Sequence, residues 1–226
     1  MSMPFYVAPE QVMRDRADYA RKNVARGRPL VACIYAEGIL MAAENINRRL
    51  RKISEIYDRI AFAGVGKFNE LDQLRVAGVR HADTKGYTYS REDVDARSLA
   101  NVYGAYLGQV FTHEMKPMEV EIVVAELGHE AGQDSLYHIS FDGVMVDAEQ
   151  FVALGAEAEA VSERMQESVD ATDDLATALG KALAALSGPD RTIERADLEV
   201  AVLARGNGRR AFRRIGPDQV EALLGA

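Results

Sequence analysis

The chain has 226 residues, a formal net charge of -8 at pH 7 and one cysteine. This length suits one large domain or two small ones; the acidic charge argues against general nucleic-acid binding, and a lone cysteine excludes an internal disulfide. No apolar run approaches the ~20 residues of a membrane span, and there is no export signal, so we expect a cytoplasmic protein.

The chain opens with MSMPFYVA, a segment without charged side chains that is followed by proline. From the residues alone, this segment could be a frayed terminus. Pro9 and Glu10 then predict the start of a highly charged helix, and Gly27 is a suitable residue just beyond its end. The apolar line along this helix is thin, so we expect the helix to pack between subunits.

The next part of the chain predicts strands and then helices. Two apolar runs, LVACIY and ILMAA, flank a turn at Ala36-Glu37-Gly38 and predict a hairpin that is covered on both faces. A further buried strand is predicted from Arg59, and a helix after Lys67. Ser90-Arg91-Glu92-Asp93 resembles a capping box and predicts the start of another helix.

The second half repeats this order. The predicted elements are a strand over EVEIVVAEL, a hairpin around Asp142-Gly143, a strand from Phe151, a helix over Ala156 to Ser168, a helix from about Thr172 to Gly188-Pro189, strands on both sides of Asn207-Gly208, and a helix from Pro217. Because strands come in hairpins and helices in pairs, we predict two packed sheets with helix pairs outside, in one domain.

The residue types that often carry chemistry show no catalytic pattern. Cys33 lies inside an apolar strand, which favours a packed thiol. The four histidines lack metal-ligand spacing, so we expect no metal and no cofactor. Gly206-Asn207-Gly208 lies between two strands and therefore predicts a hairpin turn instead of a dinucleotide site. We expect the arginines around this turn to form a solvated strand edge.

The densest basic cluster is RRLRK, at residues 48–52. It contains no aromatic residue, which disfavours a nucleic-acid site. A site for a carboxylate is the better interpretation, because Arg and Lys bind that group through charge-assisted hydrogen bonds.

Long strings of the sequence resemble the proteasome α subunits, most closely the actinobacterial type. The strings are APEQVMRDRADYARKNVARG, LVACIYAEGILMAAENINRRLRKISEIYDRIAFAGVGKFNELDQLR, RHADTKGYTYSREDVDARSLANVYGAYLGQVFT, FDGVMVDAEQFVALG and DLEVAVLARGNGRRAFRRI, and they cover nearly the whole chain in order. The resemblance implies an α+β fold, the N-terminal-nucleophile-hydrolase-type αββα sandwich with two antiparallel sheets between helix layers. It implies one α-type domain over residues 9–226, preceded by a gating arm over residues 1–8.

The resemblance also implies that the chain is not an enzyme. Laid on the catalytic β subunits, the strings put Arg28 at the position of the nucleophilic threonine, Glu44 at that of an aspartate and Arg49 at that of a lysine. Catalysis would then belong to partner β subunits. The alternative is an active β-type hydrolase processed at an internal site, but this needs Thr, Ser or Cys just before LVACIY, where Arg28 and Pro29 stand.

The implied partners are neighbouring α subunits in a heptameric ring, the β subunits of an α7β7β7α7 particle, and a ring-shaped ATPase or other activator. Such rings template β-ring assembly, gate substrate entry for intracellular protein degradation and dock activator C-terminal tails; nucleic acid and membrane are not expected partners. The expected gate consists of Met1, Ser2, Met3, Pro4, Phe5, Tyr6, Val7, Ala8 and Pro9. Lys52 is the expected anchor for the tail carboxylate, and Ala32 the small residue that lets the tail backbone approach.

Overall fold

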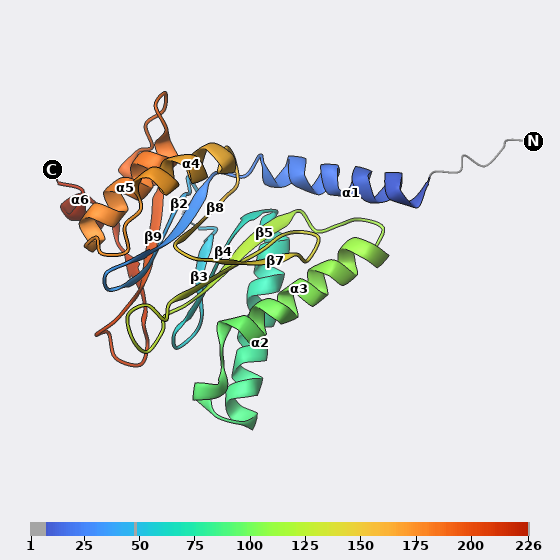
Figure 1. Cartoon of the computed structure of the whole chain (residues 1–226), viewed down its shortest axis with the longest axis horizontal. Coiled ribbons are helices and arrows are strands. Elements are labelled where there is room, and N and C mark those ends of the chain that lie inside the picture. Colours follow the sequence, from blue (N-terminus) through green and yellow to red (C-terminus); the bar gives the residue numbers. More distant parts are fainter. Residues whose placement is uncertain (1–7, 48, 226) are drawn as a thin grey trace, which may run out of the picture.

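Two stacked antiparallel sheets form the centre of the molecule, with helices on both outer faces (Figure 1). The computed structural model describes residues 8–47 and 49–225, so the predicted gate residues 1–7 lie outside the described part. Each sheet has five strands, in the orders β10-β9-β2-β1-β8 (sheet one) and β3-β4-β5-β6-β7 (sheet two). This arrangement confirms the predicted αββα sandwich.

The bounds of the elements are as follows. Sheet one contains β1 (Leu30–Tyr35), β2 (Gly38–Glu44), β8 (Phe151–Leu154), β9 (Leu198–Ala204) and β10 (Phe212–Ile215). Sheet two contains β3 (Ile53–Tyr57), β4 (Ile60–Gly66), β5 (Val120–Glu126), β6 (Ser135–Ile139) and β7 (Met145–Ala148). The helices are α1 (Pro9–Val24), α2 (Phe68–Thr88), α3 (Ala96–His113), α4 (Ala158–Ser168), α5 (Leu175–Ser187) and α6 (Pro217–Leu223).

Strand β2 shows why the central strands are continuously apolar. Met41 and Ala43 pack into the core between the sheets, whereas Leu40 and Ala42 pack under α4 and α5. Successive side chains point to opposite faces of a strand, and here both faces are covered. Helices α2 and α3 cover sheet two with a third apolar core. The predicted hairpin over β1 and β2 is therefore confirmed, including its burial on both sides.

Two local predictions need correction, and one strand was missed. Ser90 accepts a hydrogen bond from the Glu92 backbone and opens only a short 3₁₀ turn; α3 begins later, where Asp95 caps it by accepting from Ser98. Gly27 does not end α1 in a left-handed conformation; it is needed because a Cβ there would lie 2.2 Å from Cγ1 of Val65. Strand β3, which directly follows the basic cluster, was not predicted.

Helix α1 lies at one end of the sandwich, and its first turns extend beyond the strands (Figure 1). Only Ala20 and Val24 of this helix are buried. Arg16 fixes its direction, because the guanidinium donates hydrogen bonds to the carbonyl oxygens of Val110 and Glu114 at the C-terminal end of α3. A cation is favourable at that end of a helix. These hydrogen bonds therefore hold α1 against the end of α3.

None of the helices in the described residues combines the length and the apolar character that crossing a bilayer requires.

Candidate functional site

A pocket of about 300 Å³ opens where the α1–β1 link, the β2–β3 link and the start of α2 meet. Lys52, the residue predicted to anchor a carboxylate, lies in it. The lining residues are Gly27, Arg28, Glu44, Asn45, Ile46, Asn47, Leu50, Lys52, Gly66, Phe68 and Leu71. The lining thus combines apolar side chains with charged groups, a composition typical of ligand-binding pockets.

The Lys52 ammonium is poorly solvated. Its Nζ donates a 2.7 Å hydrogen bond to the carbonyl oxygen of Arg28. Burial lowers the pKa of Lys52 to about 8, and the carboxylates of Glu44 and Glu199 oppose this shift, whereas Arg28 adds to it. Lys52 therefore carries a positive charge at neutral pH, but it holds that charge less firmly than a surface lysine does.

The structure brings Arg28, Glu44 and Lys52 together. Glu44 is buried and paired with Arg28 and with Arg191, whose guanidinium lies 2.6 Å from it. Arg49, which the resemblance matches to the lysine of the β subunits, lies exposed in the turn before β3 and does not line the pocket. Because the chain turns between β2 and β3, Lys52 is the residue beside Arg28 and Glu44. Among the described residues that line the pocket, none carries a hydroxyl or a thiol.

The predicted partner of Lys52, Ala32, lies elsewhere. It is fully buried in the core between the sheets, opposite Met41 on β2, and does not line the pocket. Its small side chain therefore serves packing between the sheets. Of the predicted gate, the structure describes only Ala8 and Pro9, both exposed at the start of α1.

Glu199 on β9 binds the β2–β3 link that lines the pocket. This residue was not identified from the sequence. Its carboxylate is buried and accepts hydrogen bonds from Asn45 Nδ2 (2.6 Å), Arg214 (2.8 Å), and the backbone amides of Lys52 (3.0 Å) and Ile53 (3.3 Å). These contacts fix both ends of the β2–β3 link. The available signal was an acidic residue inside the apolar run LEVAVLA, since a charge in such a strand needs buried partners.

Glu199→Ala is expected to lower the free energy of unfolding by about 3–5 kcal/mol, because it leaves Arg214 and two backbone amides without their buried acceptor. Glu199→Gln keeps the shape and should cost less. Urea unfolding of the purified chain measures both. Glu163→Ala, at an exposed position on α4, is the matched control and should change stability by less than about 0.5 kcal/mol. Equal losses for Glu199→Ala and the control would contradict this role.

Cys33 is the packed thiol that the sequence predicts. It lies in the core between sheet one and helices α4 and α5. Burial raises its pKa to about 12, with a further contribution from Asp173. A thiol that stays protonated is a poor nucleophile. The described residues also contain no group of three side chains placed to hold a metal ion.

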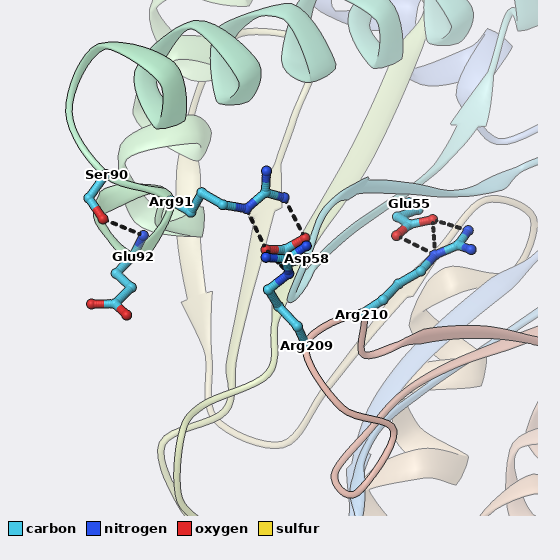
Figure 2. A network of polar contacts seen from close by, with 7 residues as sticks. All are labelled: Glu55, Asp58, Ser90, Arg91, Glu92, Arg209 and Arg210. Carbon is cyan, nitrogen blue, oxygen red and sulfur yellow. Dashed lines mark hydrogen bonds and ion pairs between the residues drawn. The ribbon is translucent and has the colours of Figure 1, made fainter.

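A second polar cluster ties the turn between β3 and β4 to two distant segments (Figure 2). Arg91 binds Asp58 through two hydrogen bonds of 2.7 and 3.0 Å, and Arg209 approaches the same carboxylate at 3.5 Å. The hydrogen bonds from Arg91 lower the pKa of Asp58. Arg210 pairs with Glu55 in the same view. Arg209 and Arg210 pair with carboxylates of the chain, but their side chains remain 75% and 71% exposed. Arg213 on the edge strand β10 is also exposed, so the predicted solvated strand edge is confirmed.

The turn between β9 and β10 confirms one prediction. Gly206 and Gly208 adopt φ values of +82° and +72°, a conformation that favours glycine. The GxG is therefore a hairpin turn.

Comparisons with known proteins give a consistent result. A family model described as "Proteasome subunit" matches residues 24–203. A protein named "Proteasome subunit alpha" from Acidimicrobium ferrooxidans is 58% identical over 225 residues, which is 100% of this chain and 97% of that protein. Proteins of the same name from Sanguibacter keddieii and Thermobifida fusca are 54% and 51% identical; each alignment covers 99% of this chain, and 90% and 91% of those proteins. The chain belongs to the proteasome subunit family and is similar over its full length to actinobacterial α subunits.

Proposed function

We propose that this chain is a non-catalytic α subunit of a cytoplasmic proteasome core particle. It forms heptameric outer rings, templates β-ring assembly, gates substrate entry and docks activators. The observation that carries the proposal is the pocket itself. Arg28 and Glu44, at the positions matched to the catalytic threonine and aspartate, line it together with Lys52, and its described lining contains no hydroxyl or thiol nucleophile. Catalysis then belongs to β subunits.

The same pocket is suited to the C-terminal tail of an activator. The Lys52 ammonium would bind the terminal carboxylate through a charge-assisted hydrogen bond. Leu50, Phe68 and Leu71 line the pocket beside it and would accept apolar side chains of the tail. Such an interaction in a partly buried pocket contributes about 1.5–3 kcal/mol. When several tails dock on one ring, losses at each pocket combine through avidity.

The gate would be formed by residues 1–9. In a ring, seven arms converge on one axis, where charged arms would repel one another and uncharged arms can pack. Phe5, Tyr6 and Val7 fit this requirement. Arg16 supports the proposal, because its hydrogen bonds hold α1, the helix that follows the arm in the sequence, against the end of α3.

Tail binding should weaken at alkaline pH. The ammonium of Lys52 is charged below its pKa of about 8 and neutral above it, so the association constant should fall about tenfold per pH unit above that value. Fluorescence anisotropy of a labelled tail peptide, from about pH 7 to 9.5, measures this. Lys52→Arg keeps its charge over the range and should show no such fall. A parallel decline in both proteins would mean that another group titrates.

Peptide hydrolysis tests whether the chain is catalytic. The purified chain alone should not cleave fluorogenic peptides, and cleavage should appear only when it is assembled with a β partner. An active-site-blocked β partner should abolish the activity again. Cleavage by the pure chain would overturn the proposal.

A further inference from the structure

Lys52 differs from the other lysines of the chain in what its ammonium contacts. Lys67, Lys85, Lys116 and Lys181 each form an ion pair with a carboxylate. Lys22 is exposed on α1. Lys52 instead donates to a neutral acceptor, the carbonyl oxygen of Arg28, inside the pocket of about 300 Å³. An amine that is desolvated and held by a neutral oxygen loses its proton more readily than one held by a carboxylate.

We propose that Lys52 is a site of covalent acylation, at which a small acyl phosphate transfers its acyl group to Nζ. The neutral amine attacks the carbonyl carbon of the acyl group and an N–C bond forms. The C–O bond to phosphate breaks, and phosphate leaves with the electron pair. The amine proton passes to water, and the product is an uncharged amide.

The state of the amine favours this step. With a pKa of about 8, about a quarter of Lys52 is neutral at pH 7.5, against about one part in a thousand for an ordinary lysine. Desolvated lysines are activated as nucleophiles in this way. The charged groups that face Lys52 are Arg28 from the α1–β1 link, Glu44 from β2 and Glu199 from β9. Because Arg191 and Arg214 pair with the two carboxylates, the negative charge at the amine is largely balanced.

The pocket also fits the reagent. Its volume exceeds the space that a small acyl group needs, and the guanidinium of Arg28 at its rim is about half exposed, 48%. Arginine is well suited to bind a phosphate group, so it would hold the leaving group while Lys52 attacks. Because Arg28 also pairs with Glu44, it would bind the phosphate through its remaining N–H groups, which favours an anionic acyl donor over a neutral one.

Acylation would remove the charge on which tail docking depends. This consequence rests on the proposed function, whereas the modification itself does not. A particle acylated at Lys52 would lose activator-dependent degradation and keep its β subunits.

The test measures acylation at each lysine. The purified full chain is incubated with acetyl phosphate at about pH 7.5, and the occupancy of each lysine is followed by peptide mass spectrometry. Lys52 should react at least about tenfold faster than the exposed Lys22, since its larger neutral fraction outweighs its lower basicity and restricted access. Its rate should level off above pH ~8, while that of Lys22 continues to rise. A rate at Lys52 equal to or below that at Lys22 would overturn the proposal.

Two further arms separate the causes. Arg28→Gln removes a charge that lowers the pKa of Lys52, so it should slow acylation by an uncharged active ester slightly and acylation by acetyl phosphate more strongly. Equal slowing by both reagents would contradict phosphate binding at Arg28. In the assembled particle, activator binding should fall in proportion to Lys52 occupancy. Rapid acylation with unchanged activator binding would contradict the docking role of Lys52 but not the modification. Slow acylation, together with loss of docking in a Lys52→Ala particle, would contradict the modification but not the docking role.

Discussion

A particle carrying Lys52→Ala should not bind its activator and should show no activator-stimulated protein degradation. Alanine removes the ammonium that lies in the pocket beside Arg28 and Glu44. A loss of about 1.5–3 kcal/mol corresponds to about 10- to 150-fold weaker binding per tail. Because several tails dock on one ring, the combined effect should exceed the single-tail loss by orders of magnitude.

Co-sedimentation of the activator with wild-type and variant particles measures this effect, and native mass confirms that the variant particle is assembled. Arg49→Ala is the matched control. Arg49 belongs to the same basic cluster, but it is exposed and does not line the pocket. Surface charges of that kind usually contribute little, so binding should be unchanged. Undiminished binding by Lys52→Ala, or equal losses in the two variants, would show that the cluster acts only as general positive charge.

Deletion of residues 2–8 should raise peptide hydrolysis by the assembled particle several-fold, although the β active sites are unchanged. The deleted arm precedes the exposed Pro9, where α1 begins. The barrier is steric, so the gain should be small for short peptides and grow with the length of the substrate. Hydrolysis of a peptide series of increasing length measures this dependence.

A variant that keeps the arm at full length distinguishes steric blocking of the entrance from apolar packing between the arms. Replacing Phe5, Tyr6 and Val7 with serine keeps the length but removes apolar surface, and should open the gate only in part. Identical rates for the wild type and the deletion at every substrate length would identify the arm as a frayed terminus.

The layered fold could be predicted because its signals are local. Gly38 and the apolar runs on both sides of it specify the β1–β2 hairpin, in which every residue from Gly38 to Glu44 is buried. The start of α3 was predicted less accurately. Two capping residues, Ser90 and Asp95, stand close together in the sequence, and only the second leads into the helix.

The candidate site was harder to predict, because its support comes from remote parts of the chain. Glu199 contacts Asn45 across a sequence separation of 154 residues. Arg210 pairs with Glu55 across a sequence separation of 155 residues. A pattern of neighbouring residues cannot predict such a pair. Lys52 itself was found through the resemblance, whereas its contact with Arg28 depends on how the β2–β3 link turns.

Co-expression of this chain with a β subunit from the same source, followed by native mass and electron microscopy, tests the central claim most directly. We expect a four-ring particle in which this chain occupies both outer rings and the β subunit occupies both inner rings. A tag fused to this chain, labelled for electron microscopy, should mark the two ends of the particle. Failure to assemble with the β subunit, or placement of this chain in the inner rings, would contradict the account.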